Sequence, residues 1–170
     1  MKYTLPTVLL SFFLFACQPS DQPLDQNQVG EELPTLTELL MSPGFDAELA
    51  EALGSDAYGM KSYVMAFLYA GPNRDRDSTE AFELQAAHMA NISRMAEEGT
   101  LVLAGPFLDG GELRGIYVFD VPTVEEAEAL TNTDPAIQAG SLRMELLPWY
   151  GSAGLKAINH LHGKMAKDPI

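Results

Sequence analysis

The chain has 170 residues, of which 46% are hydrophobic, and a formal charge of −14 at pH 7. This length is enough for one domain with its own core. The negative charge argues against nucleic acid or an anionic lipid surface as a partner, because like charges repel. We interpret the acidity as a means of keeping an exported domain soluble.

The first 16 residues have the features of a removable export signal. Lys2 provides a basic start, and an apolar run follows from Leu9 to Ala16. The run is shorter than the ~20 residues of a membrane-spanning helix, but it fits the apolar part of a signal peptide. Its end, Leu14-Phe15-Ala16-Cys17, resembles the lipobox that lipoprotein signal peptidase cleaves. We therefore expect lipid attachment at Cys17 and a lipoprotein anchored to the cell envelope.

The use of cysteine agrees with this interpretation. Cys17 is the only cysteine of the chain, so no internal disulfide can form. The alternatives are an ordinary secretory signal with a chance cysteine nearby, or an uncleaved anchor. Residues 17–32 are rich in Gln, Asp and Pro, which is typical of a flexible tether. Gln18 stands where an Asp would resemble an inner-membrane retention signal, so in a cell with two membranes we expect the outer membrane or another position facing the periplasm.

The first strong strand of the chain follows a short extension. Residues 33–59 are predicted to form short helical pieces, broken at Pro43-Gly44. The predicted strand, Lys61–Tyr69, carries apolar side chains at both odd and even positions. A strand covered on one side alternates apolar with polar residues. This strand is therefore expected to be covered on both sides.

An amphipathic helix comes next, from about Thr79 to Glu98, with Asp77 or Ser78 as its cap and Gly99 as its end. At about 100° per residue, one face collects the apolar side chains and one histidine. This face contains Ala81, Phe82, Leu84, His88, Met89, Ile92, Met95 and Ala96. Asn91 and Arg94 fall largely on the opposite, polar face.

Three strands, a second helix and a tail complete the chain. The strands are expected at Thr100–Ala104, Leu113–Asp120 and Leu142–Trp149, the second helix between Thr123 and about Asn132, and a tail at 152–170 with a short helix over Leu155–Lys164. The β-α-β-β-α-β order predicts an α+β, ferredoxin-like domain over 60–151. Its two helices cover one face of a four-stranded antiparallel sheet. The second face is expected to pack against another copy in a homodimer, or under the extension or the tail.

Four segments, taken together, resemble the YciI-like family, the family of YCII-related domains. They are His88, residues 98–106 (EGTLVLAGP), Asp134-Pro135 with Ala139-Gly140, and residues 145–149 (ELLPW). The resemblance runs from about Tyr63 to Tyr150. It implies the dimeric α+β barrel fold, and therefore a homodimer. It also implies an active site made of a His-Asp pair, here His88 and Asp134. The family includes a dehydrochlorinase that acts on a chlorinated hydroxyhydroquinone, and most members have no established reaction.

The chemistry of such a pair is well defined. A carboxylate that accepts one ring N–H fixes the tautomer of the histidine and stabilises its imidazolium form. The other ring nitrogen can then act as a general acid or base. His88 also fits as a satisfied core residue, and Asp134 as a turn residue before proline. Weaker candidates for the same site are Gly105-Pro106, Asp109, Arg114, Tyr63 and Tyr69.

No cofactor is expected. The sequence has no Ser nucleophile motif, phosphate-binding glycine loop or dinucleotide fingerprint. His160 and His162 would diverge on a helix, so a metal site is poorly supported, and nothing marks a haem pocket around His88.

Two functions therefore stay open. One is a cofactor-free enzyme with lyase-like or isomerase-like proton transfer on a small cyclic or aromatic molecule, carried by His88 and Asp134. The other is a non-catalytic envelope module that binds a small molecule or another protein. The enzyme hypothesis requires the pair to be within hydrogen-bond distance and open to a pocket.

Overall fold

The computed structural model describes residues 44–168. The expected signal peptide, the lipidation site Cys17, the tether at 17–32 and the first part of the extension lie outside the described residues. All elements discussed below belong to the second of two compact units, Phe45–Ile170. Within 44–168, none of the helices combines the length and the apolar character needed to cross a membrane.

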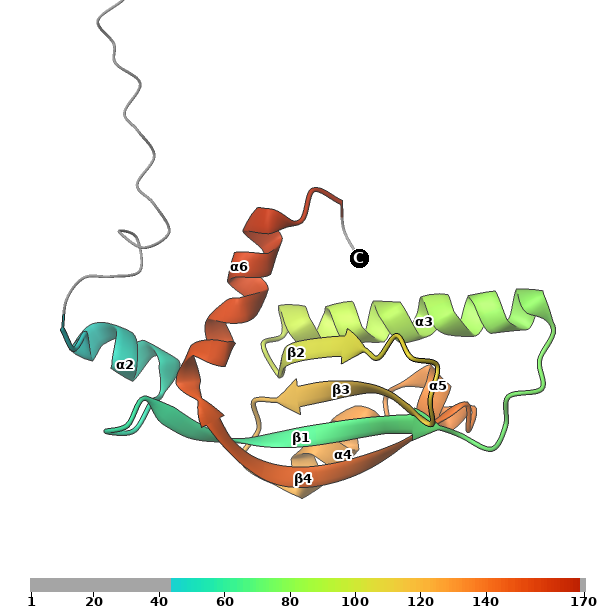
Figure 1. The fold of residues 1–170 in the computed structure, drawn as a ribbon, viewed down its shortest axis with the longest axis horizontal. Coiled ribbons are helices and arrows are strands. Elements are labelled where there is room, and N and C mark those ends of the chain that lie inside the picture. Colours follow the sequence, from blue (N-terminus) through green and yellow to red (C-terminus); the bar gives the residue numbers. More distant parts are fainter. Residues whose placement is uncertain (1–43, 169–170) are drawn as a thin grey trace, which may run out of the picture. The chain divides into compact units, whose positions relative to one another are not determined.

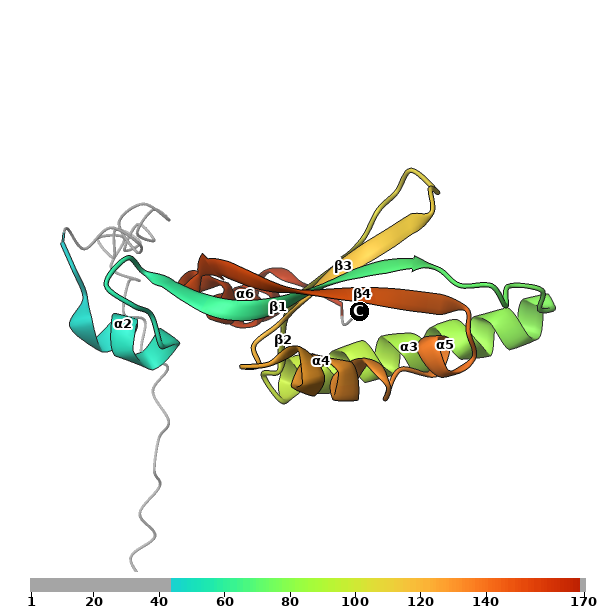
Figure 2. The ribbon, with the colours of Figure 1, turned by 90° about the horizontal axis from the view of Figure 1, so that it is seen from below.

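Four antiparallel strands form one sheet in the order β2-β3-β1-β4 (Figure 1). The strands are β1 (Met60–Ala70), β2 (Leu101–Pro106), β3 (Leu113–Phe119) and β4 (Leu142–Ser152). Three helices lie on one side of this sheet: α3 (Ser78–Glu97), α4 (Val124–Thr131) and the short α5 (Pro135–Gln138) (Figure 2). The predicted α+β, ferredoxin-like fold is thereby confirmed.

The two edge strands are longer than predicted. β2 continues through Gly105 and Pro106, where the strand was expected to stop, and β4, which was expected to include Pro148, continues past Trp149 to Ser152. A proline lacks the N–H that a central strand would need, but it is tolerated in a strand with one free edge. β2 and β4 are the two edges of this sheet, so proline does not end either strand.

The main core lies between the sheet and the helices. Alternate residues of the central strand β1 point into it, namely Val64, Ala66 and Leu68. The other buried members of this core are Met95, Leu101, Tyr117, Phe119, Val121 and Ala127. Burial of a side chain of this size stabilises a fold by roughly 1.5–3 kcal/mol, so this layer anchors α3 and α4 on the sheet.

The prediction for the two faces of α3 is wrong at three positions. Ala81, expected on the apolar face, is exposed. Phe82 is 75% exposed, because the N-terminal turns of α3 extend past the end of the strands (Figure 1). Asn91, expected on the polar face, is buried. The segment before α5 packs against α3 at this point, which the periodicity of a single helix cannot reveal.

The second face of the sheet is covered at one end. Tyr63, Val102 and Val118 are buried there together, and Leu155 of the tail packs against them. At the other positions this face is open, and Leu147 is 45% exposed. The sequence predicts that this face is covered by a second copy, by the extension or by the tail. In the structure the tail covers part of it.

The two terminal segments also contain short helices. α2 (Ala47–Leu53) lies in the extension, and the hydroxyl of Tyr150 in β4 donates a hydrogen bond to Asp56, which follows α2. The tail begins with a 3-10 turn, η1 (Ala153–Ala157), and continues as α6 (Ile158–Met165). The tail helix thus starts three residues later than predicted, because the side chain of Ser152 caps η1 by accepting from the N–H of Gly154.

Candidate functional site

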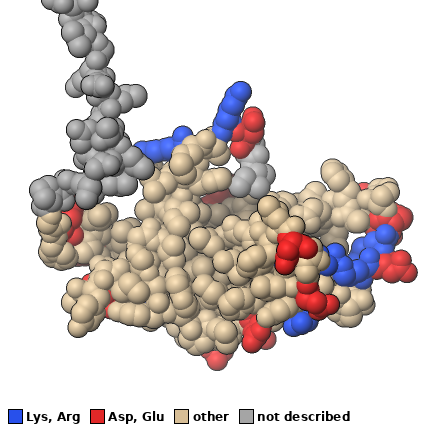
Figure 3. Space-filling view, viewed as in Figure 1, with Lys and Arg blue, Asp and Glu red and all other residues tan. Residues whose placement is uncertain are grey.

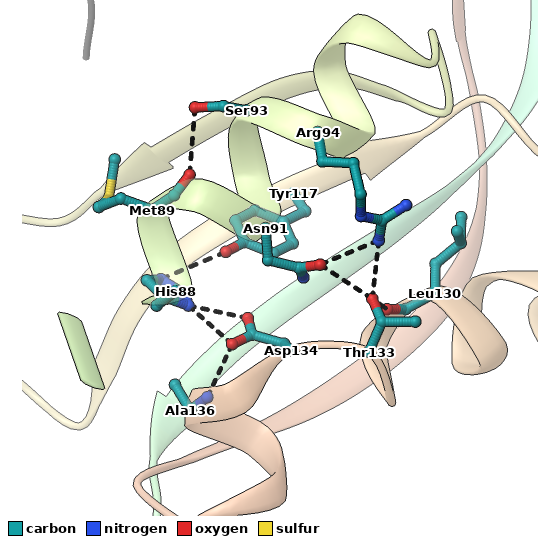
Figure 4. Close-up of polar contacts among 10 residues, drawn as sticks. All are labelled: His88, Met89, Asn91, Ser93, Arg94, Tyr117, Leu130, Thr133, Asp134 and Ala136. Carbon is teal, nitrogen blue, oxygen red and sulfur yellow. Dashed lines mark hydrogen bonds and ion pairs between the residues drawn. The ribbon is translucent and has the colours of Figure 1, made fainter. Parts of the chain in front are cut away.

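His88 and Asp134 lie side by side, although 46 residues separate them in the sequence. His88 projects from the middle of α3, and its Nδ1 is 2.8 Å from Oδ2 and 3.0 Å from Oδ1 of Asp134 (Figure 4). The His88 side chain is 10% exposed, whereas that of Asp134 is fully buried. The pair that the sequence suggests is therefore within hydrogen-bond distance, with only the imidazole reaching solvent.

Asp134 is held by the start of α5. It is the N-cap of this helix, and its Oδ1 accepts a hydrogen bond of 2.8 Å from the N–H of Ala136. Pro135 follows as the first helical residue, where its fixed φ suits a helix start and its missing N–H costs nothing. One carboxylate thus both caps α5 and contacts His88.

The contact with Asp134 determines which nitrogen of His88 carries the proton. A carboxylate can only accept, so Nδ1 must donate, and Nε2 then carries the free lone pair. The hydroxyl of Tyr117 lies 3.4 Å from this Nε2. The two rings are stacked, with 6.4 Å between their centroids and 22° between their planes. Nε2 therefore faces a phenol on the side of the ring away from Asp134.

Tyr117 is a stable hydrogen-bond donor in this position. Burial, and secondly the negative charge of Asp134, raise the pKa of the Tyr117 hydroxyl well above its ordinary value of 10.0. The phenol therefore stays protonated and donates to Nε2. Tyr117 is not among the site residues predicted from the sequence. Its alternation with Phe119 on a strand indicates a core position, and the only further signal is that it lies on the face of β3 directed toward α3.

A second polar network fixes the segment that carries Asp134. Oδ1 of Asn91 accepts from Nη2 of Arg94 at 2.9 Å and from the hydroxyl of Thr133 at 3.1 Å. Arg94 also donates to the Thr133 hydroxyl at 3.0 Å (Figure 4). Thr133 directly precedes Asp134 in the chain. The network thus attaches the Asp134 segment to α3, one turn from His88.

A cavity of about 1100 Å³ lies along α3, the edge strand β2 and the tail. His88 and Tyr117 line it, together with the apolar side chains of Leu68, Met89 and Ile92. Figure 3 shows that the charged side chains on the face of Figure 1 lie mostly along its edges, while uncharged residues cover its middle. The site therefore combines a polar pair with apolar walls, as ligand pockets commonly do.

The weaker candidates divide between the two faces of the sheet. Gly105, Pro106 and Arg114 line the same cavity as His88. The hydroxyl of Tyr63 donates to the carbonyl of Ser152 at 3.0 Å, and that of Tyr69 to Glu145 at 3.3 Å, both on the opposite face. Those two tyrosines thus do not belong to the His88 site.

Three further positions were considered from the sequence, namely Asp109, His160 and His162. Asp109 makes a turn, where its side chain accepts from the N–H of Gly111 at 3.1 Å. His160 is exposed and His162 lines the far wall of the cavity. Across residues 44–168, three or more His, Cys, Asp or Glu side chains nowhere gather in a way that could hold a metal ion.

Comparison with known proteins supports one family. Residues 63–150 match the family model of the YCII-related domain. The uncharacterized protein YjpA of Bacillus subtilis (strain 168) is 32% identical over 73 residues, which cover 42% of this chain and 84% of YjpA. A solved structure, 5-chloro-2-hydroxyhydroquinone dehydrochlorinase from Burkholderia phenoliruptrix AC1100 in complex with 2,5-dihydroxybenzoquinone, aligns with a TM-score of 0.38 and 17% identity, over 50% of this chain and 92% of that chain.

Proposed function

The chain belongs to the family of YCII-related domains, and from this membership and its site we propose a cofactor-free enzyme that transfers protons on a small cyclic or aromatic molecule. One observation carries the proposal. His88 is held by a buried carboxylate through Nδ1, and the same histidine lines a cavity with apolar walls. A histidine that only filled the core would have no reason to line a cavity of this size.

The roles of the residues follow from the geometry. Nε2 of His88 accepts a proton from an acidic C–H or O–H of the substrate, while Asp134 stabilises the imidazolium that forms. The imidazolium then returns the proton, to another atom of the ring in an isomerisation or to the leaving group in an elimination. The hydroxyl of Tyr117, which donates to the same nitrogen, turns its hydrogen toward the substrate oxygen and stabilises the negative charge that develops there.

The walls of the cavity suit a ring compound. Leu68, Met89 and Ile92 offer apolar surface beside His88. Such surface favours a flat apolar ligand over a strongly hydrated one. The reacting polar groups would then lie at the imidazole and the phenol, which line the same cavity.

A binding module without catalysis is the second candidate function. The observation that favours it is the contact of 3.4 Å between the Tyr117 hydroxyl and Nε2 of His88. If Nε2 of His88 keeps the hydrogen bond from Tyr117 when a ligand binds, it cannot accept a proton from that ligand. His88 would then be part of the pocket wall and not a base.

Deuterium exchange separates the two candidates. The protein is incubated in D2O with ring ketones and hydroxylated benzenes, beginning with cyclohexanone and resorcinol, and C–H exchange is followed by NMR. We expect exchange with the wild type and loss of at least 100-fold in the His88→Asn variant, while His160→Asn, an exposed control, behaves as wild type. Binding of a ring compound without exchange would favour the binding module. Equal exchange in all three proteins would refute the proposal that His88 catalyses proton transfer.

We also propose a homodimer and a lipid anchor. Support for the homodimer is the open part of the second sheet face, where Leu147 is 45% and Trp149 37% exposed. Light scattering of the wild type and of a Leu147→Glu variant tests it, with a mass of two chains expected only for the wild type. Support for the anchor to the cell envelope is the sequence around Cys17.

A further inference from the structure

We propose that Arg114 binds the acidic group of an anionic ligand in the cavity of His88, so that the substrate is a small organic acid. This inference rests on the proposed function, because it names the substrate class of the same site. The strand pairing of Arg114, its hydrogen bonds and the charges along the cavity support it.

Arg114 occupies an irregular position in the sheet. Leu68 of β1 pairs with Gly115, and the next residue, Tyr69, pairs with Leu113. Arg114 is thus the extra residue of a β-bulge. In a regular strand it would point away from Gly115 and Tyr117, which face α3. It lines the same cavity as His88 instead. A bulge is a common device for redirecting a side chain toward a site.

The guanidinium of Arg114 has unused donors. Its Nη1 donates to the carbonyl of Gly110 at 3.2 Å, and its Nε is buried without a hydrogen-bond partner. The ion pairs found among residues 44–168 do not include Arg114. Within residues 44–168, this cavity arginine therefore has no carboxylate within ion-pair distance. A guanidinium offers paired N–H donors that match a carboxylate, which a bound ligand could supply.

The backbone around Arg114 is packed closely. A Cβ at Gly115 would lie 2.6 Å from the carbonyl oxygen of Gly105. The absence of a side chain at Gly115 therefore lets β2 and β3 approach each other closely at the residue next to Arg114. Arg114 and Tyr117 are three residues apart on β3, which is about 10 Å along a strand. A six-membered ring with a carboxylate on one side and a reactive group on the other spans such a distance.

The charges along the cavity favour an anion near His88. Arg74 lines the same cavity and donates to the carbonyl of Ser141 at 3.2 Å. The cavity also contains two carboxylates, those of Glu97 and Asp168. Glu97 lies nine residues after His88 on α3, about 14 Å away along the helix axis, and Asp168 lies beyond α6. The acidic group of a ligand beside His88 would therefore meet the arginines.

A matched pair of probes tests the proposal. Calorimetry with the full chain compares 4-hydroxybenzoate with 4-hydroxybenzamide, which has the same shape but no charge. We expect the acid to bind at least about ten-fold more tightly, and Arg114→Gln to remove this preference, as the loss of a charge-assisted hydrogen bond implies. Arg143→Gln is the control, because Arg143 stacks on Tyr69 on the opposite face at 4.2 Å. It should keep the preference of the wild type.

Three results would overturn the assignment of Arg114. They are equal binding of the two probes, no binding of the acid at 10 mM or below (about the weakest affinity of interest), and an unchanged preference in Arg114→Gln. A thermal melt of each variant confirms that it is folded. His88→Asn separates this inference from the proposed function, since it should lose deuterium exchange and keep the preference for the acid. A preference for the acid without any exchange in the wild type would refute only the enzyme.

Discussion

The hydroxyl of Tyr117 lies 3.4 Å from Nε2 of His88, at the ring nitrogen opposite to the one that Asp134 holds. The imidazole is thus contacted at both nitrogens, by a carboxylate from the start of α5 and by a phenol from β3. Tyr117 also packs in the core against Phe119, with 5.8 Å between the ring centroids. The phenol is therefore fixed by the core and connects it to the cavity.

The first prediction concerns this phenol. Tyr117→Phe removes only the hydroxyl, so we expect the free energy of unfolding to fall by about 0.5–1.5 kcal/mol, the usual net value of one hydrogen bond. If the phenol stabilises charge during proton transfer, the deuterium exchange rate falls by about 10–100-fold. Urea unfolding and NMR exchange measure the two quantities. An exchange rate equal to that of the wild type would exclude a role for the hydroxyl.

Asp134 is predicted to have separable structural and chemical roles. Asp134→Asn keeps an oxygen that can accept from the N–H of Ala136, so α5 remains capped, but it loses the charge that stabilises the imidazolium. We expect a folded protein with exchange reduced at least about 100-fold. Asp134→Ala loses the cap as well as the charge-assisted hydrogen bond. Its free energy of unfolding should be about 2–4 kcal/mol lower than that of the wild type. Similar stability of the two variants would contradict this separation.

Gly71 is predicted to be essential for the position of α5. A Cβ at this residue would lie 2.2 Å from the carbonyl oxygen of Gly140, which belongs to the backbone after α5. Neither backbone can move without disturbing the N–H of Gly71, which donates to Ser141 at 2.8 Å. We expect Gly71→Ala to destabilise the protein by about 2 kcal/mol or more, as overpacking does.

A glycine in open space provides the control for Gly71. Gly163 lies within α6, and a Cβ there would meet nothing within 4 Å. Gly163→Ala should leave the protein as stable as the wild type or stabilise it by about 0.5–1 kcal/mol, since alanine favours a helix. Thermal melts compare the two variants, and equal melting temperatures would show that the close approach at Gly71 is readily relieved.

The stability of the protein should fall at high pH because of Tyr63. Burial, and secondly the charge of Asp120, raise the pKa of the Tyr63 hydroxyl to about 12 from its ordinary value of 10.0. The raised value means that the folded state holds this proton more tightly than the unfolded state. The contribution is complete below pH 10, the unfolded pKa, and is lost as the pH rises toward 12.

Denaturant titrations of the wild type and Tyr63→Phe across this range test the effect. At neutral pH the variant should be less stable, since it lacks the hydrogen bond to Ser152. Above pH 10 only the wild type carries the titrating phenol of residue 63, so the difference between the two proteins should shrink. A difference that stays constant to pH 12 would show that this tyrosine has the same pKa in both states.

Lipidation at Cys17 is predicted from the sequence alone. The wild type expressed in a bacterial host should incorporate radiolabelled palmitate and fractionate with membranes, because an acylated N-terminus anchors a protein more firmly than a surface contact does. Cys17→Ala should incorporate no label. A variant that stays bound to membranes, or a wild type without label, would contradict the assignment.

Some features of the fold could be predicted from the sequence alone, because they depend only on residues that lie close together in the chain. The alternating apolar positions of β1, the period of α3 and the caps at Asp77 and Thr123 act over a few residues. Such local preferences can be recognised in the sequence, and the order of the predicted strands and helices was enough to predict the ferredoxin-like fold. The pairing of His88 with Asp134 was suggested through the family resemblance.

The site itself was decided by contacts between distant segments. Tyr117 reaches His88 because of the register of β3 beside β1, and Asn91 is buried because the segment before α5 packs on α3. Arg114 faces the cavity because one residue is inserted in the strand pairing. Register, bulges and packing are set by the lowest free energy of the whole domain and not by the propensity of one segment. Only the tertiary structure could therefore decide which side chains surround the imidazole.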